Sequence, residues 1–184
     1  MINLYRQIVI LIVLAVLSGS VLAERYDPLL LRAQASIFPK IILLDQDLET
    51  KITGNEVVIT IISTTHELNT ANKLKMLILD KYGGGLGGYK LSVNTVFFDD
   101  VDKSELAAAY IVLQGPELLI EKVVSHASSH KRIVFSYSYA DFIYNTTISL
   151  YVREKTYIYF NKPAINLYGI NFLPVFYKIT KIIE

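Results

Sequence analysis

Short aliphatic runs and segments with helical spacing alternate through the middle of the chain. Runs rich in Val and Ile are typical of buried strands, and apolar residues three or four apart are typical of amphipathic helices. We expect, in chain order, a strand at Glu56–Ile62, a helix from Thr64 to about Lys81, strands at Leu91–Phe97 and Ala108–Leu113, a helix from Pro116 to about Ser129, and a strand at Arg132–Tyr137. This order of βαβ units predicts a largely parallel sheet.

A first helix should precede these units. Asp27 is a good N-cap and Pro28 is favoured at the first helical position. Apolar residues then recur at helical spacing from Leu29 to Leu44, and Pro39 should kink or split the helix.

The helix after the first strand has the spacing of a capping box, because Glu67 follows Thr64 by three residues. Its apolar face should carry Leu68, Ala71, Leu74, Leu77 and Ile78.

The C-terminal part should add antiparallel structure. Strands at Ile148–Val152 and Tyr157–Phe160 are separated by a polar turn and should pair as a hairpin. The tail, Leu173 to Ile183, has an amphipathic helical pattern with Phe176, Ile179 and Ile183 on one side. The predicted fold is a single α/β domain: a mixed, largely parallel sheet flanked by helices, with a C-terminal β-hairpin and a terminal helix.

The amino end has the layout of a secretory signal peptide. Arg6 is the one charge before an apolar run at residues 8–17, and small residues follow, with Val21 and Ala23 at the −3 and −1 positions of a cut between Ala23 and Glu24. A retained membrane anchor is the alternative, but a spanning helix needs about 20 apolar residues and this run is shorter.

Cleavage would divide the chain into a signal peptide at 1–23 and a domain at 24–184. We therefore expect an exported protein, located in the periplasm after the signal peptide is removed.

Composition narrows the classes of function. The chain has 18 Lys and Arg and 17 Asp and Glu, so loss of Arg6 with the leader leaves a formally neutral domain. A neutral domain lacks the positive footprint that nucleic acid requires. There is no cysteine, so stability should come from burial of apolar side chains without disulfides.

Two motifs suggest a ligand site at first sight. The glycine run at residues 82–89 lacks the ending of a phosphate-binding loop and follows a helix, so a flexible connection is the better interpretation. His126 and His130 have a spacing that can chelate zinc, but a third ligand is missing and both lie at a helix C-terminus, where polar residues offset the helix dipole. His66, in the first turn of its helix, is expected on the surface.

The remaining polar clusters carry no complete motif. Asp99, Asp100 and Asp102 lack the rest of a calcium-binding loop and read as a solvated turn. The hydroxyls at 136–138 lack a nucleophile elbow, and the glycosylation pattern at 145–147 is one that occurs often by chance. We therefore predict no catalytic, cofactor-binding or metal-binding residue, and a protein that is not an enzyme.

The last part of the chain has a characteristic order of elements. A strand at 131–136 is followed by a polar loop, a hairpin at 148–161 that ends in Phe160 and Asn161, and a short segment containing Gly169 and Ile170 before the terminal element. This order resembles the YfiR-like family of periplasmic proteins, most clearly over residues 108–184. The chain differs from the usual family pattern in lacking a Trp-Pro after the first helix, in having Thr146-Thr147 where glycines are usual, and in lacking cysteines.

The resemblance implies a periplasmic regulator. Family members bind the periplasmic part of an inner-membrane diguanylate cyclase, repress it and thereby lower cyclic-di-GMP and biofilm formation, and they tend to form homodimers. The matching positions look structural: Asn161 should cap the next helix, and Gly169 should take the left-handed conformation at its end.

Three functions are compatible with these observations. The first is a partner-binding regulator, for which the exposed side of the first helix and the tyrosine-rich hairpin are the candidate surfaces. The second is a small-ligand binding or transport accessory protein with a pocket at the carboxyl edge of the sheet. The third, an unrecognised hydrolase, has no motif to support it.

Overall fold

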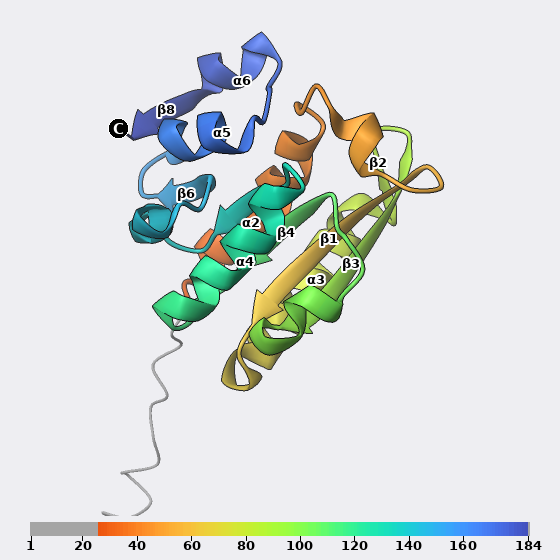
Figure 1. Cartoon of the computed structure of the whole chain (residues 1–184), viewed down its shortest axis with the longest axis vertical. Helices are drawn as coiled ribbons and strands as arrows, with labels where there is room; N and C mark the ends of the chain where they lie inside the picture. Colours follow the sequence, from red (N-terminus) through yellow and green to blue (C-terminus); the bar gives the residue numbers. More distant parts are fainter. Residues whose placement is uncertain (1–25, 184) are drawn as a thin grey trace, which may run out of the picture.

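The structure, a computed structural model, describes residues 26–183 (Figure 1). The predicted signal peptide at residues 1–23 and the predicted cut between Ala23 and Glu24 lie outside the described residues. The helices are α2 (Pro28–Ile42), α3 (Leu68–Tyr82), α4 (Glu117–Ser129), α5 (Lys162–Tyr168) and α6 (Pro174–Ile179), with 3-10 turns η1 (Leu48–Lys51), η2 (Thr65–Glu67), η3 (Phe98–Lys103) and η4 (Tyr139–Tyr144). The strands are β1 (Glu56–Ser63), β2 (Gly85–Leu86), β3 (Tyr89–Phe97), β4 (Ala109–Val112), β5 (Ile133–Ser136), β6 (Ile148–Val152), β7 (Thr156–Asn161) and β8 (Thr180–Ile183).

These strands form one sheet of eight in the order β2-β3-β1-β4-β5-β6-β7-β8. The run from β3 to β6 is parallel throughout, whereas β2 is antiparallel to β3 and β7 is antiparallel to β6. The predicted α/β fold with a mixed, largely parallel sheet is therefore confirmed, and so is the hairpin of β6 and β7.

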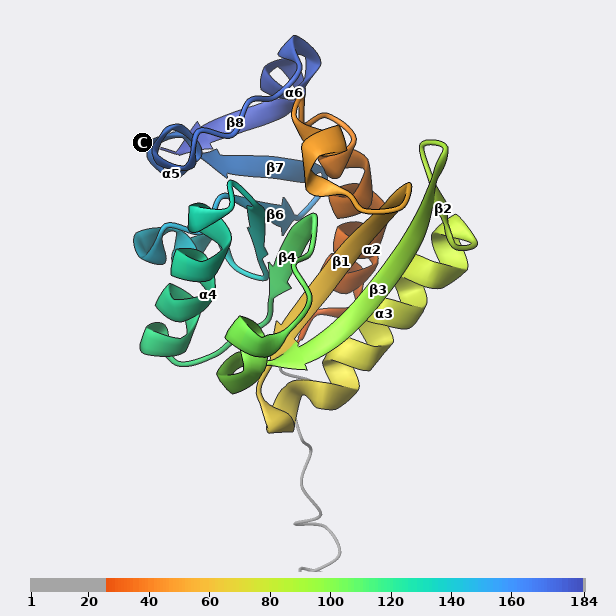
Figure 2. The same ribbon diagram turned by 45° about the vertical axis from the view of Figure 1, so that its right-hand side comes forward.

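The direction of the crossovers places the helices on both faces of the sheet. The chain moves outward from β1 to β3 through α3, then returns past β1 to β4 and continues through α4 to β5. Because such crossovers are right-handed, this reversal puts α3 and α4 on opposite faces. α2 packs beside α3, so these two helices cover one face and α4 covers the other (Figure 2).

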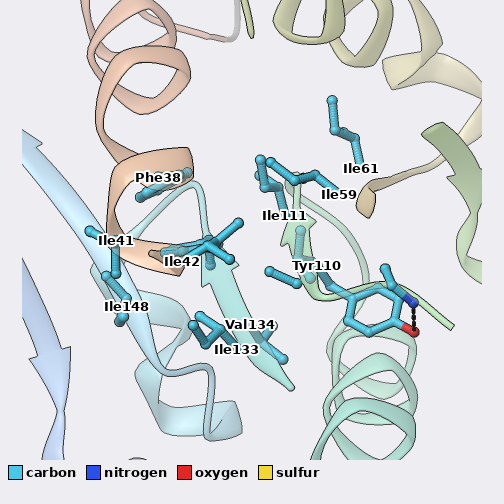
Figure 3. Close-up of a cluster of buried hydrophobic side chains, with 14 of the residues drawn as sticks. Phe38, Ile41, Ile42, Ile59, Ile61, Tyr110, Ile111, Ile133, Val134 and Ile148 are labelled. Carbon is cyan, nitrogen blue, oxygen red and sulfur yellow. Dashed lines mark hydrogen bonds between the residues drawn. The ribbon is translucent and has the colours of Figure 1, made fainter. Parts of the chain in front are cut away.

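The core lies between α2 and the central strands. Phe38 of α2 is fully buried and stacks on Phe135 of β5, with ring centroids 4.2 Å apart. Figure 3 shows Ile41 and Ile42 on the same helix pointing toward Ile148 and the β5 residues. The continuous burial of β4 and β5 explains their unbroken apolar sequences, because parallel strands are covered on both faces.

The predicted terminal helix is wrong in its second half. α6 ends at Ile179, and β8 then pairs in parallel with β7, Thr180 lying opposite Ile158. The tail after Ile179 is rich in Ile and Thr, which suit a strand, and the edge of β7 offers backbone groups that a strand can pair with. A segment this short fits the apolar spacing of a helix and that of a strand equally well. Pairing with the edge of β7 makes it a strand.

Two further predictions about helix ends need correction. Pro39 does not split α2, which continues to Ile42 and stops two residues short of the predicted Leu44. The capping box at Thr64 does not form, because the 3-10 turn η2 intervenes and Thr64 makes no side-chain cap bond. α3 therefore begins at Leu68, which is exposed instead of facing the core.

The glycine run folds back on β3 as a tight antiparallel turn. β2 pairs with the first residues of β3, and Gly83, Gly84, Gly87 and Gly88 all have positive φ. A side chain at Gly87 would also collide with Leu43, since its Cβ would lie 2.7 Å from the nearest Leu43 carbon. The glycines allow the positive φ angles of this turn, and larger residues at these positions would strain the backbone.

Candidate protein-binding surface

The β6–β7 hairpin has one apolar face and one aromatic face. Ile148 is buried on the side of α2 (Figure 3). Leu150, two residues further along the same strand, is also buried and shares this side. Because side chains alternate along a strand, Tyr151 projects from the opposite side. The register places Tyr157 directly across from Tyr151 and Tyr159 across from Ser149, so the three tyrosines share this face.

A fourth ring joins them from outside the hairpin. Tyr139, at the start of η4, meets Tyr151 edge-on at 5.8 Å and Tyr159 at 5.7 Å between ring centroids. Tyr159 also lies 6.3 Å from Tyr151 and 6.4 Å from Tyr157. These spacings are those of mutually stabilising aromatic pairs. We call the set of Tyr139, Tyr151, Tyr157 and Tyr159 the tyrosine face.

Two cations border the tyrosine face. The guanidinium of Arg153, in the hairpin turn, lies 5.1 Å from the ring centre of Tyr151. The ammonium of Lys181 on β8 lies 3.8 Å from the ring centre of Tyr157. Both distances are within the range of cation–π attraction, which holds the rings in place while leaving the charges at the rim.

The tyrosine face has the properties of a protein interface. Tyr139 is 46% exposed and the three hairpin tyrosines are half-buried, so their ring surfaces remain partly open to solvent. Tyrosine combines a large apolar ring with a hydroxyl that tolerates water, which is why it is enriched in interface cores. Rings already ordered by their neighbours lose little further conformational freedom on binding.

Exposed apolar side chains continue around the end of the sheet. β8 is the edge strand there, and Tyr177, Ile179 and Ile182 are each about half exposed: 49%, 50% and 50%. In Figure 2, α6 and β8 lie together at this end, beyond β7. An unpaired edge beside apolar side chains is a second element that a partner can use.

The other predicted binding surface, the exposed side of the first helix, has fewer exposed apolar side chains. Leu29, at 64% exposure, is the only large apolar side chain of α2 that is exposed. Leu31, Phe38, Ile41 and Ile42 face the core. Of the two surfaces proposed from the sequence, the hairpin carries the larger aromatic area.

The two histidines of α4 lie near each other but face different partners. Their ring centroids are 5.5 Å apart. Nε2 of His126 lies 3.1 Å from the hydroxyl of Tyr110, and its Nδ1 lies 3.6 Å from the carboxylate of Asp102. Nδ1 of His130 lies 3.0 Å from the backbone oxygen of His126 at the helix end. Burial, together with the nearby His130, lowers the pKa of His126, and Asp102 partly opposes the shift.

Within residues 26–183, no three acidic or histidine side chains are grouped as a metal site would require. The aspartates of η3 instead meet lysines: Asp100 pairs with Lys103 at 3.0 Å and Asp102 with Lys122 at 2.9 Å. His66 is exposed, as its sequence position predicted.

The hydroxyl residues after β5 are used inside the protein. Ser136 is buried and its hydroxyl donates to the backbone oxygen of Ser138 at 2.8 Å. Asn145 is exposed, but Thr147, the third residue of the glycosylation pattern, is fully buried and donates its hydroxyl to the oxygen of Val134 at 2.9 Å.

A tyrosine covers the carboxyl ends of β4 and β5. Tyr26 is 3% exposed, and its hydroxyl accepts from the backbone N–H of Gln114, just after β4, at 2.9 Å. Its ring meets Tyr137, just after β5, edge-on at 4.6 Å.

Two members of the surface could not be found from strand periodicity. Tyr139 lies in a 3-10 turn that only the tertiary fold brings against the hairpin, and Lys181 lies in a segment expected to be helical. The hairpin itself was predicted, but a turn at residues 153–156 would pair Val152 with Tyr157, whereas the structure pairs Val152 with Thr156 and Tyr151 with Tyr157. No helix among the described residues is both long and apolar enough to cross a bilayer.

Comparison with known proteins supports the fold and does not bear on the function. Neither a protein-family model nor a curated protein matches the chain. Among solved structures, a conserved domain protein from Vibrio cholerae O1 biovar El Tor strain N16961 is similar with a TM-score of 0.56 and 14% identity over 84% of this chain and 60% of that one. The ABC domain of Streptococcus pneumoniae in complex with L-Trp is similar with a TM-score of 0.50 and 11% identity over 78% of this chain and 62% of that one. The chain thus spans about three fifths of the length of these proteins, and at such identities they are related to it in fold alone.

Proposed function

We propose that this protein is an exported binding module that docks a partner protein on its tyrosine face. The observation that carries the proposal is the cluster of Tyr139, Tyr151, Tyr157 and Tyr159, ordered by its own ring contacts and left partly open to solvent. A soluble domain gains little stability from such rings unless something covers them, because their exposed area contributes no burial.

The rim of the face suits a partner with acidic groups. Arg153 and Lys181 lie over two of the rings and keep their charge toward solvent. Carboxylates of a partner would meet these cations at the edge while its apolar side chains cover the rings.

The resemblance to YfiR-like proteins supplies the identity of the partner in this proposal. It is the periplasmic part of an inner-membrane diguanylate cyclase, which the protein represses so that cyclic-di-GMP falls. Export supports the same partner, since the leader at residues 1–23 would deliver the domain to the compartment that such a receptor faces.

Deletion of the gene and complementation test both parts of the proposal. Deletion should raise cellular cyclic-di-GMP, and the wild-type gene should restore it. A double variant, Tyr157→Thr with Tyr159→Thr, should fail to restore it, because Thr keeps the strand preference but removes both rings. Met76→Gln is the matched control: it removes a side chain that is 55% exposed on α3, a helix that lies with α2 on the other face of the sheet, and should behave as wild type.

Capture of membrane proteins from detergent extracts tests separately whether the tyrosine face is the docking surface and whether a cyclase is the partner. The wild-type protein and Met76→Gln should retain a cyclase, and the tyrosine double variant should lose it while circular dichroism shows that it is still folded. If deletion leaves cyclic-di-GMP unchanged, the cyclase is not the partner. If the double variant captures the same membrane proteins as wild type, the tyrosine face is not the docking surface.

A further inference from the structure

A polar pocket of about 380 Å³ lies at the amino edge of the sheet, and none of its lining residues belongs to the tyrosine face. Three separate segments meet there: the η1 turn, the turn between α4 and β5, and the loop between α5 and α6. The lining residues are Asp47, Thr50, Lys51, His130, Lys131, Arg132 and Asn171.

Arg132 is the unusual member of this set. Its side chain is charged, yet it is only 8% exposed. Its Nε and Nη1 atoms are inaccessible to solvent and have no hydrogen-bond acceptor among the described residues. A buried guanidinium without an anion within ion-pair distance is costly, because a cation loses its hydration without compensation. Burial accordingly lowers the pKa of Arg132.

Asp45, the carboxylate whose charge acts on Arg132, already has other hydrogen-bond partners. Asp45 accepts from the ammonium of Lys51 at 2.5 Å through Oδ2, and from the backbone N–H of Asp47 at 3.0 Å through Oδ1. Asp45 and Lys51 are both nearly inaccessible to solvent and form a closed pair. Asp45 is therefore not free to neutralise Arg132 by a direct contact.

The second acidic side chain of the pocket is also engaged. Asp47 accepts from the side-chain amide of Asn171 at 3.3 Å and has no ion pair with Lys131 or Arg132. With Asp45 and Asp47 set against Lys51, Lys131 and Arg132, the pocket keeps one net positive charge before any protonation of His130.

The local backbone is shaped to present these cations. The end of α4 forms a Schellman turn: the N–H of Lys131 bonds to Ser128 at 3.0 Å and the N–H of Arg132 bonds to Ala127 at 2.9 Å. Lys131 takes the left-handed position of this turn at φ 55°, where glycine is the usual residue. A lysine is less suited to this conformation than glycine, because its Cβ crowds the following carbonyl oxygen.

We propose that this pocket binds a small oxyanion, the phosphate or carboxylate group of a small molecule, with Arg132 and Lys131 as its anchoring cations. An oxyanion at the mouth of the pocket would compensate the buried guanidinium and accept hydrogen bonds from Lys131 and from the amide or hydroxyl groups of Asn171 and Thr50.

The proposal is tested by the melting temperature of the protein without residues 1–23. It is measured in phosphate and, as the reference, in sodium chloride of equal ionic strength. Phosphate should raise the melting temperature beyond chloride, because a ligand that binds the folded state stabilises it. Succinate in place of phosphate tests carboxylates, and co-sedimentation with phosphatidylglycerol vesicles distinguishes a lipid headgroup from a soluble ligand.

Two variants locate the effect. Lys131→Gly should weaken phosphate binding about tenfold, as expected for loss of one charge-assisted contact, while its glycine suits the left-handed turn. Arg132→Met should abolish the phosphate response, and its folded state in chloride should be at least as stable as wild type, because the uncompensated cation is gone.

Lys155→Gln, an exposed cation in the hairpin turn, is the control and should leave the response unchanged. The proposal is overturned if phosphate, succinate and vesicles all act no differently from chloride. It is equally overturned if the response survives intact in both Lys131→Gly and Arg132→Met.

Discussion

His126 links the ionisation of one side chain to the stability of the whole domain. It lies between the buried hydroxyl of Tyr110 and the carboxylate of Asp102, and thereby connects α4 to β4 and η3. Burial lowers its pKa below the value of about 6.5 that it has in an unfolded chain. The unfolded state therefore takes up the proton more readily than the folded state.

The sign of the pH dependence follows from this difference. The contribution of neutral His126 to stability should be complete above about pH 6.5 and should be lost as the pH falls through the lower folded-state pKa. The free energy of unfolding, measured by urea denaturation at pH 7.5 and 5.5, should fall at the lower pH more in wild type than in His126→Gln. His66→Gln, a change at an exposed histidine, should keep the wild-type difference. Equal pH slopes in wild type and His126→Gln would contradict the assignment.

Asn161 shows how one residue joins two elements. Its side-chain oxygen accepts from the N–H of Ala164 at 3.2 Å and caps α5, as predicted from the sequence. Its amide nitrogen donates to the oxygen of Phe142 in η4 at 3.0 Å. Gly169 ends the same helix with φ 63°, which confirms the prediction of a left-handed residue there.

Replacement of Asn161 by Ala should lower the free energy of unfolding by about 1–3 kcal/mol, since the buried N–H of Ala164 loses its acceptor and the bond to the oxygen of Phe142 is lost as well. Chemical denaturation measures the loss. Asn166→Ala, at an exposed position of the same helix, should change stability by less than about 0.5 kcal/mol. A loss of less than about 0.5 kcal/mol in Asn161→Ala would contradict the capping role.

The edges of the sheet show where pairing overrides local preference. The last turn of the predicted helix becomes β8, because the exposed edge of β7 supplies backbone partners. The same strand brings Lys181 over Tyr157. An element assigned wrongly from the sequence is thus part of the proposed binding surface.

Export should determine where the whole molecule acts. If residues 1–23 are a signal peptide, protein recovered from the periplasmic fraction should begin at Glu24, as N-terminal sequencing or intact mass would show. Replacing Ala23 with a bulky residue such as Leu should block the cut and leave the leader attached. Mature-length protein in the cytosolic fraction would contradict export.

The position of Tyr26 makes the cut relevant to folding as well. Two residues after the expected new terminus, its side chain is already buried against Tyr137 and Gln114.

The α/β class, the order of the central strands along the chain, the hairpin and the caps of α5 follow from local rules that the sequence displays directly. Aliphatic runs such as 108–113 need burial on both faces, and Asn161 and Gly169 have the side chain or the freedom that helix ends need. These preferences act over a few residues, so they can be read without knowing what lies nearby.

Long-range contacts account for what local rules missed. Tyr139 joins Tyr151 and Tyr159 only because η4 folds against the hairpin, and packing buries the Nε and Nη1 atoms of Arg132 without an acceptor while Asp45 pairs with Lys51. β8 is a strand because β7 is beside it. Each depends on groups far apart in the chain, whose distance is set by packing and which no local pattern of apolar and polar residues encodes.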